Sequence, residues 1–504
     1  MKKILISTIA VSALLLNVSC ENDFDQDVND IVVSSGQADF SKYVALGNSL
    51  TSGYRDNALY IEGQTESYPN MIAQQMMRAG GGVFVQPMVS DENGGLVLNG
   101  NTIAATKIQL TGFDSFGSPI TGNVTAAPTT DITKKVTGAI NNFGVPGAKT
   151  AHLIAPGYGN IANLPSAANP YYVRFSTSAT STVLGDALAQ NPTFVSLWIG
   201  NNDVLGYATS GGDGSNPITP SAGAVGVGFD NTYSYIINTL FPEGNARKGV
   251  IANIPYVTSI PFFTTVPYKP VPGPKIAANV AALNGLYGQL KTALAVLNVN
   301  DRIVEDLTAT GSNRVLIVDE SLPNLSAQLT TVFTGAGMPA LQAAAFGQIF
   351  GQARQSRPTD MILLTTGSVI GTPAAGAPAQ VNVYGLSYPL QDRHVLIPSE
   401  AAEIKTAVDV MNAKIKSLAD AKGLAFVDAN AKMVELGKAS GIQYDNVKYN
   451  AKFITGGTFS LDGVHLTGRG YALIANEFLS AINSKYGSTL PMLNVNSYSG
   501  VKFP

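Results

Sequence analysis

Cysteine is almost missing from this sequence, and histidine is rare. Cys20 is the single cysteine, so no disulfide can form within the chain. The three histidines are scattered, and together with one cysteine they match no zinc-ligand spacing. A phosphate-binding P-loop motif is missing as well. We therefore expect a protein that works without a metal and without a cofactor.

Charged residues are also scarce. They make up 13% of the chain, the formal net charge is −3, and no dense stripe of Lys and Arg is present. A nucleic-acid partner is therefore not expected, since such proteins carry a basic footprint. The 45% of apolar residues is typical of a globular protein. The length fits one elaborated α/β domain or two to three average domains.

The N-terminus has the features of an export signal. Two lysines precede an apolar segment, Ile4 to Leu16, which has the length of a signal peptide and is too short for a membrane span. We predict a signal peptide at residues 1–19. The next residue, Cys20 in "LNVSC", resembles the acylated cysteine of bacterial lipoproteins. Residues 20–37 would then be a lipidated cysteine and an acidic tether, anchoring the protein to a membrane of the cell envelope, with the outer membrane expected. The alternative is a secretory signal with an incidental cysteine.

Apolar runs that end at turn residues alternate with helical segments, which is typical of a parallel sheet covered by helices. The sequence predicts an α/β fold, a three-layer sandwich with about five parallel strands. The expected strands are Tyr43–Leu46, a weaker one before Gly144, Thr193–Ile199, Gly249–Ile254 and Leu424–Asp428. The expected helices are Lys275–Leu297, a second one that begins after Pro398-Ser399 and stops at Gly423, and a third near the C-terminus.

Two segments interrupt this alternation. Residues 79–137, rich in Gly, Thr and Val, predict a β-rich insertion, and residues 300–396 predict a second, helical insertion. Within the latter, Ser321 to Ala353 contains no charged residue. It is either the core of a subdomain or an apolar lid or acyl-binding wall over the functional site.

The stretch "YVALGNSLTSGY", Tyr43 to Tyr54, contains a candidate nucleophile. Its apolar run ends at Gly47, and Ser49 follows two residues later. α/β folds place their chemistry at the carboxyl ends of parallel strands, so Ser49 would lie at such an end. An ordinary strand-to-helix turn has the same composition, so the rest of the chain must decide.

A serine nucleophile needs a base, most often histidine. His465, in "SLDGVHLTGRGY", follows Asp462 by three residues and precedes an amphipathic helix. A carboxylate in that position can bind the imidazole Nδ1–H and stabilise the imidazolium while Nε2 faces the serine. His394, expected on a linker, and His152, expected on a short helix, have no carboxylate so placed.

Two further turns could supply oxyanion donors. In "SLWIGNNDVLGY", a predicted strand is followed by Gly200-Asn201-Asn202-Asp203, and a side-chain amide at the carboxyl end of a strand can donate to a developing oxyanion. In "NNFGVPGAKT", Gly147 allows the backbone to approach a ligand closely and offers its N–H.

In this order, the four stretches resemble the blocks of the SGNH (GDSL-type) hydrolases, esterases and lipases on a flavodoxin-like sheet. The resemblance implies a triad of Ser49, His465 and Asp462. It also implies an oxyanion hole of the Ser49 and Gly147 N–H groups and the Asn202 amide. Asn48 stands where the family name has Asp. The hydrolase domain would span residues 38–487, followed by a C-terminal tail at 488–504.

The resulting hypothesis is a serine ester hydrolase that works through an acyl-enzyme. Three substrate classes compete: O-acetyl groups on polysaccharide, fatty-acyl or lysophospholipid esters, and simple short-chain esters. The alternative is an inactive surface module for glycan binding or adhesion on the same scaffold, a hypothesis motivated by the large insertions and the predicted anchor.

Overall fold

The structure is a computed structural model that describes residues 32–504. The predicted signal peptide, Cys20 and most of the predicted tether lie outside the described residues. Within residues 32–504, no helix combines the length and the apolar character needed to cross a membrane.

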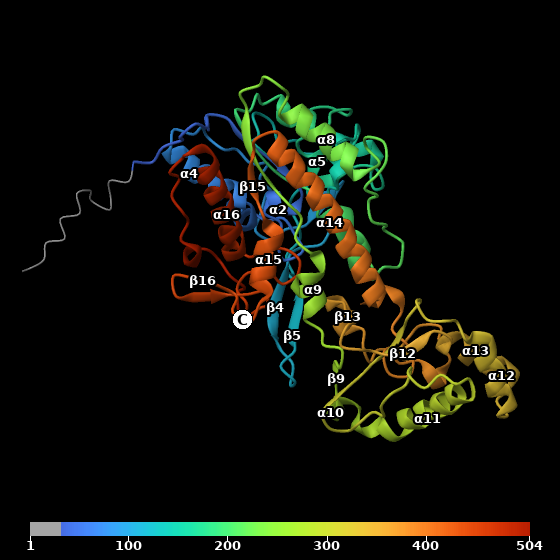
Figure 1. The fold of residues 1–504 in the computed structure, drawn as a ribbon. Coiled ribbons are helices and arrows are strands. Elements are labelled where there is room, and N and C mark those ends of the chain that lie inside the picture. Colours follow the sequence, from blue (N-terminus) through green and yellow to red (C-terminus); the bar gives the residue numbers. More distant parts are fainter. Residues whose placement is uncertain (1–31) are drawn as a thin grey trace, which may run out of the picture.

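A parallel sheet of five strands forms the centre of the molecule (Figure 1). Its order is β15-β8-β7-β1-β6, and all four neighbouring pairs run parallel. Each of the five predicted strands is present, and the predicted α/β class is confirmed. The strands are β1 (Tyr43–Gly47), β6 (Asn142–Gly144), β7 (Phe194–Trp198), β8 (Lys248–Ala252) and β15 (Ala425–Val427).

Helices cover the sheet. On one face, α4 (Tyr68–Arg78) packs beside α16 (Gly468–Tyr486). The ring of Trp198 contacts Tyr68 of α4 and Phe478 of α16 there, with centroid distances of 5.6 and 6.0 Å, so Trp198 is a core residue. Helices α8 (Phe229–Leu240) and α14 (Pro398–Ala421) pack together as a further layer, and α14 contacts β8 and β15.

The sequence explains the limits of α14. Pro398 occupies the first turn, where its missing N–H is harmless, and the Glu400 carboxylate accepts a hydrogen bond from the Ile397 N–H. Ile404 and Val408 belong to the buried stripe, four residues apart as helical periodicity requires. The chain leaves the helix through Gly423, whose φ of 61° favours glycine.

The predicted β-rich insertion is present as two antiparallel hairpins. They are formed by β2 (Leu96–Leu98) with β3 (Asn101–Ala104), and by β4 (Ile108–Phe113) with β5 (Pro119–Asn123).

A second lobe, at the lower right of Figure 1, has its own hydrophobic core, formed by residues from Val271 to Ile397. It contains α11 (Val280–Val296), α12 (Ser326–Gly335) and α13 (Ala340–Phe350). This packing unit therefore begins before residue 300, where the sequence predicted the second insertion to start. The predicted helix 275–297 is also interrupted, because α10 (Gly273–Ile276) ends in a 3₁₀ turn before α11 begins.

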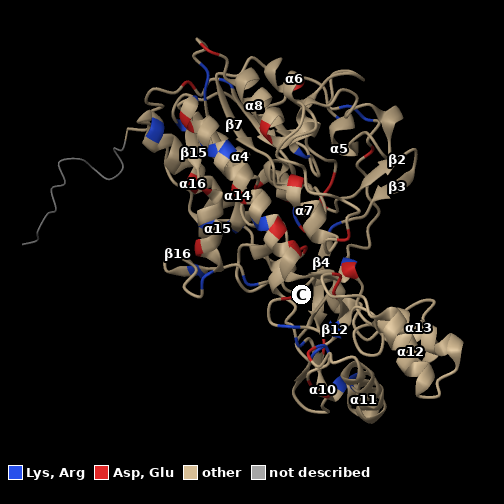
Figure 2. Ribbon diagram, turned by 45° about the vertical axis from the view of Figure 1, so that its right-hand side comes forward, with Lys and Arg blue, Asp and Glu red and all other residues tan. Residues whose placement is uncertain are grey.

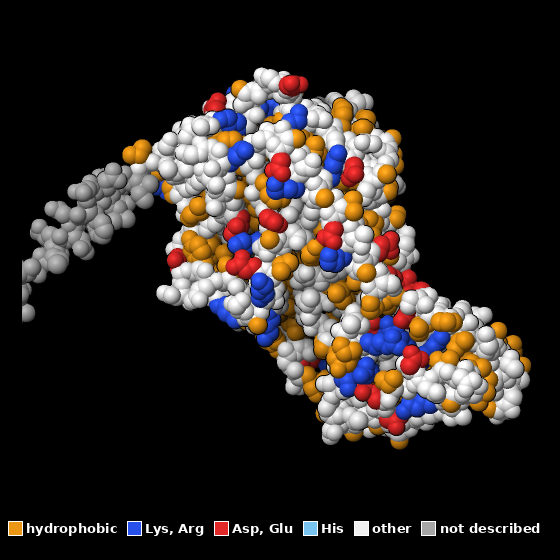
Figure 3. All heavy atoms as spheres, in the orientation of Figure 1, with side chains coloured by type: hydrophobic (Ala, Val, Ile, Leu, Met, Phe, Trp, Pro, Cys, Tyr) orange, Lys and Arg blue, Asp and Glu red, His pale blue; other side chains and the backbone are white. Residues whose placement is uncertain are grey.

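The charged side chains are interspersed by sign. Lys and Arg are scattered among Asp and Glu along the ribbon in Figure 2, and the face of the second lobe seen in Figure 3 shows the same mixture. Ion pairs such as Lys269–Glu305 and Lys291–Asp306 belong to this lobe.

The C-terminal segment 488–504 packs against the main domain. Leu490, Leu493 and Val495 are buried in the main core. Further along, the Ser499 N–H donates to the Glu66 carboxylate. The end of the chain is thus part of the folded domain.

Candidate active site

Ser49 lies where β1 ends and a short helix, α2 (Ser49–Ser52), begins. The side chain of Asn48 caps this helix by accepting the Leu50 N–H at 3.0 Å. Gly47 is required at the strand end because a β-carbon there would lie 2.4 Å from the Trp198 carbonyl oxygen. The turn holds Ser49, which is 7% exposed, at the carboxyl edge of the sheet.

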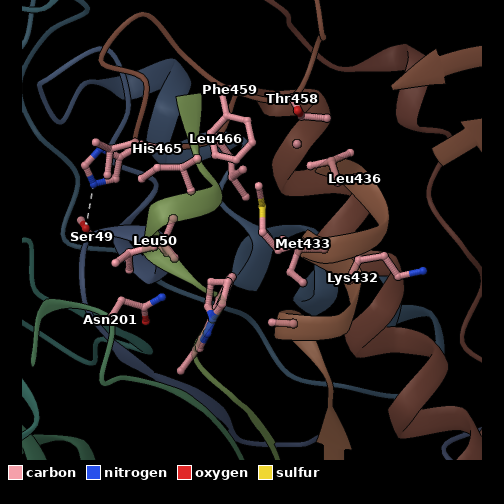
Figure 4. Close-up of a pocket in the computed structure, with 18 of the residues that line it drawn as sticks. Ser49, Leu50, Asn201, Lys432, Met433, Leu436, Thr458, Phe459, His465 and Leu466 are labelled. Carbon is pink, nitrogen blue, oxygen red and sulfur yellow. Dashed lines mark hydrogen bonds between the residues drawn. The ribbon is translucent and has the colours of Figure 1, made fainter. Parts of the chain in front are cut away.

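Ser49, His465 and Asp462 form one hydrogen-bonded chain. His465 Nε2 lies 2.8 Å from Ser49 Oγ, and His465 Nδ1 lies 2.8 Å from Asp462 Oδ2 (Figure 4 shows the first of these). Ser49 and His465 are 416 positions apart in the sequence. The loop before α16 carries both His465 and Asp462, so the spacing seen in the sequence places the carboxylate beside the imidazole.

Asp462 is held as an ionised carboxylate. Burial raises its pKa, but the attraction of His465 and the hydrogen bonds from the His465 and Asn57 N–H groups outweigh this effect and hold the pKa well below its usual range. An ionised carboxylate only accepts hydrogen bonds, so His465 Nδ1 carries the proton. His465 Nε2 is then free to accept the proton of the Ser49 hydroxyl.

Tyr54 supports the histidine from the side. Its ring packs on the His465 imidazole, with centroids 4.8 Å apart, and its hydroxyl donates to the Asn57 carbonyl. The sequence analysis did not identify Tyr54 as a site residue, although it closes the stretch that contains Ser49.

Gly147 lies in a tight turn after β6. The Ala148 N–H donates to the Val145 carbonyl, and Gly147 has a φ of 78°, as at the third position of a type II turn that has proline at the second. Gly147 is exposed, and a β-carbon there would meet no atom within 4 Å. Within residues 32–504, neither the Gly147 N–H nor the Ser49 N–H has a hydrogen-bond acceptor, so both can bind an oxyanion.

Asn202 begins α7 (Asn202–Thr209), which follows β7 after a short turn. Its side-chain amide donates to the Ala148 carbonyl at 2.9 Å, which places it against the turn that contains Gly147. Since an amide NH₂ group has two hydrogens, one remains for a ligand. The structure therefore places Asn202 at the cavity that Ser49 lines.

The two residues that flank Asn202, Asn201 and Asp203, were given no role from the sequence, and they help to fix the relative position of these turns. Asn48 donates to the Asn201 side-chain oxygen at 3.2 Å, joining the turns after β1 and β7. The buried Asp203 carboxylate accepts the Thr150 N–H and hydroxyl, joining the turns after β7 and β6. Burial raises the pKa of Asp203, although both hydrogen bonds oppose this. The signal in the sequence was the run of polar residues "NND" itself.

An apolar cavity of about 110 Å³ adjoins Ser49 and His465 (Figure 4). Its wall comes from α2, the end of β7, α15 (Ala429–Gly437) and α16. No residue of Ser321 to Ala353 lines it. The interpretation of that segment as a lid or acyl-binding wall is therefore wrong, because its buried residues, among them Phe333 and Phe346, pack inside the second lobe.

The two other histidines lie elsewhere. The short helix expected around His152 is a 3₁₀ turn, in which His152 Nδ1 accepts the Lys149 N–H. His394 is buried, and its Nδ1 accepts the Gln391 N–H. Burial and the neighbouring Arg393 lower the pKa of His394 to about 4. Both rings thus hold local turns together.

One group of carboxylates in the described part of the chain is close enough to share a cation. It consists of Glu320, Asp392 and Glu400, whose ligand oxygens lie within 4.8 Å of one another. The group lies beside the second lobe, and none of its members lines the cavity at Ser49. The candidate active site itself contains Ser, His, Asp, Asn and backbone N–H groups.

No protein-family model matches this sequence, and neither the curated proteins nor the solved structures gave a match. The function must therefore be inferred from the geometry of the site.

Proposed function

We propose that this protein is a serine ester hydrolase of the SGNH (GDSL) type, with Ser49 as nucleophile, His465 as general base and Asp462 as its partner. The observation that carries the proposal is the hydrogen-bonded chain from Ser49 Oγ through His465 to Asp462 at the carboxyl edge of the sheet. The sheet order supports it, since in chain order the strands lie 2-1-3-4-5, as in flavodoxin-like folds.

In the proposed mechanism, His465 Nε2 takes the Ser49 proton as Oγ attacks the ester carbonyl carbon. The N–H groups of Ser49 and Gly147 and the Asn202 amide stabilise the oxyanion, the largest single contribution in acyl transfer. The imidazolium, stabilised by Asp462, then protonates the leaving alcohol. Water, activated in turn by His465, attacks the acyl-enzyme and releases the acid.

The test is hydrolysis of p-nitrophenyl butyrate by the purified protein, beside Ser49→Ala and Ser52→Ala. Ser52 is the matched control, since it is a buried serine on the same short helix and its hydroxyl donates to the Ser49 carbonyl. We expect Ser49→Ala to lose at least about 10³-fold in kcat and Ser52→Ala to keep most activity. Equal rates for the wild type and Ser49→Ala would refute the proposal.

We further propose that Cys20 is acylated and anchors the protein to a membrane of the cell envelope, the outer membrane by expectation. The lipobox-like "LNVSC" and the preceding apolar segment support this. Labelling cells with an alkyne fatty acid tests it: the wild type should incorporate the label, and Cys20→Ser should not. Label in Cys20→Ser at the wild-type level would contradict the anchor.

A further inference from the structure

We infer that the apolar cavity beside Ser49 binds the acyl chain of the substrate, so that the protein hydrolyses fatty-acyl esters in preference to acetyl esters. This inference rests on the proposed function and narrows it to one of the three substrate classes. It assigns the specificity to α15 and α16, which the sequence analysis did not connect with the site.

Most of the cavity wall is hydrocarbon. Helix α15 contributes Met433 and Leu436, and helix α16 contributes Leu473 and Ile474. Leu50, which directly follows the nucleophile, lies on the opposite side of the cavity from Met433 (Figure 4). A chain that enters from Ser49 would therefore exchange water for apolar side chains along its length, which stabilises binding by about 0.8 kcal/mol for each buried CH₂.

Away from Ser49, His465 and the asparagines beside them, the polar side chains of the wall are those of Trp198, Thr458 and Lys432, and each is bound to another protein group. The Trp198 indole N–H donates to the Asn253 carbonyl, and the Thr458 hydroxyl donates to the Asn450 carbonyl. The Lys432 ammonium is paired with Glu435 and Glu477 and points away from the cavity (Figure 4). A sugar would leave its hydroxyls without partners there, at a substantial cost in free energy, whereas a hydrocarbon chain would not.

The acyl chain, rather than the alcohol, fits the cavity because of the second half of the reaction. The Ser49 Oγ–acyl carbon bond forms as the bond from that carbon to the alcohol oxygen breaks, and His465 gives its proton to the alcohol. The water that then hydrolyses the acyl-enzyme must enter from the side that the alcohol has left. The exposed turn at Gly147 is open to water, whereas the apolar cavity disfavours water. The alcohol therefore fits the side of Gly147, and the acyl chain fits the cavity.

Ala429 offers a direct test, since it is a small residue of the cavity wall. Ala429→Leu should fill the cavity, Leu436→Ala should enlarge it, and Ala431→Leu, on the exposed side of the same helix, is the matched control. The readout is kcat/KM for p-nitrophenyl esters from acetate to palmitate. In the wild type we expect kcat/KM to rise about fourfold for each methylene that enters the cavity.

We expect Ala429→Leu to move the optimum to shorter chains, with a loss of about tenfold or more on the ester preferred by the wild type. Leu436→Ala should move it to longer chains, and Ala431→Leu should not move it. If all four proteins hydrolyse esters with one common chain-length profile, the inference is overturned while the proposed function stands. The inference is also overturned, and the proposed function stands, if kcat/KM rises with the length of the alcohol in a series of alkyl acetates.

A binding measurement keeps the two proposals distinguishable if no ester is hydrolysed. Ser49→Ala should bind the fluorescent fatty acid cis-parinaric acid, and lauric acid should displace it. Adding Ala429→Leu should weaken this binding about tenfold, and adding Ala431→Leu should not. Binding of this kind without hydrolysis would support the acyl site and refute the hydrolase. Absence of binding, or equal binding by both double variants, would overturn the acyl site.

Discussion

At Asp462, the carboxylate accepts hydrogen bonds at both oxygens. Oδ1 accepts the Val464 and His465 N–H groups, and Oδ2 accepts His465 Nδ1–H and the Asn57 N–H. In Asp462→Asn, an NH₂ group in the position of Oδ2 would meet the two groups that now donate to that oxygen. Since an NH₂ group is itself a donor, neither hydrogen bond could form as it does in the wild type. The amide would then favour the tautomer of His465 that has its proton on Nε2, where a proton must be accepted.

We therefore expect Asp462→Asn to lower kcat for p-nitrophenyl esters by about 10⁴-fold at neutral pH. Circular dichroism and the melting temperature would establish that the variant is folded. A folded Asp462→Asn variant with kcat within threefold of the wild type would show that Asp462 does not orient the base.

Asn48 has two contacts that explain why a neutral residue serves at this position. It caps α2 through its oxygen and donates through its nitrogen to Asn201. Asn48→Ala should therefore lower the free energy of unfolding by about 1–2 kcal/mol, the usual effect of losing a helix cap, and should also lower kcat, since Ser49 is the first residue of that helix. Urea unfolding and ester hydrolysis measure the two effects. Unchanged stability and unchanged kcat together would contradict this role.

Among the elements, the start of α14 carries a pH-sensitive group. Burial and the neighbouring carboxylates of Asp392 and Glu320 raise the pKa of Glu400 to about 8, and burial raises that of Asp392 to about 7. Unfolded carboxyls titrate near pH 4, so between pH 4 and 8 these two carboxyls bind more protons in the folded protein than in the unfolded chain. Their contribution therefore lowers the free energy of unfolding as the pH rises through this range.

Glu400→Gln removes one such group and keeps an oxygen for the Ile397 N–H. We expect the melting temperature of Glu400→Gln to fall less between pH 5 and pH 8 than that of the wild type. Glu243→Gln, a change at an exposed loop residue, should follow the wild type. Parallel curves for the wild type and Glu400→Gln would contradict the raised pKa.

The C-terminal segment is packed as firmly as an internal element. Leu493 is 4% exposed, while its neighbour Met492 is 46% exposed. We expect Leu493→Ala to lower the free energy of unfolding by about 2–5 kcal/mol and Met492→Ala by no more than about 0.5 kcal/mol. Urea unfolding compares the two. Similar small effects would show that residues 488–504 are a loose tail.

The elements that the sequence predicted well are those with a local signal. The strands around the site end at turn residues, and α14 has a regular apolar stripe, so both were predicted. The place of the predicted helix 275–297 in the fold was not predicted, because an apolar pattern does not say which core a helix faces. Most of this helix is α11, which packs in the second lobe. The cavity was missed for a related reason: its wall joins Leu50 to Leu473, and no spacing in the sequence connects them.

At the scale of the whole molecule, the candidate site belongs to the hydrophobic core built on the sheet and not to that of the second lobe. The sheet and its helices form the main core, and residues from Val271 to Ile397 form that of the second lobe. Ser49, His465 and the cavity between them and α15 all lie in the main domain. The resemblance to SGNH hydrolases noted from four short stretches therefore concerns the part of the chain that builds the sheet.

The central claim is that Ser49 is a nucleophile activated by His465. The most direct measurement is labelling with a fluorophosphonate probe, which forms a bond between the serine oxygen and phosphorus as fluoride leaves, followed by mass spectrometry of the digested protein. We predict one adduct, on the peptide that contains Ser49, and at least a hundredfold slower labelling in His465→Ala. No adduct on folded protein, or an adduct on another serine that is unaffected by His465→Ala, would contradict the account.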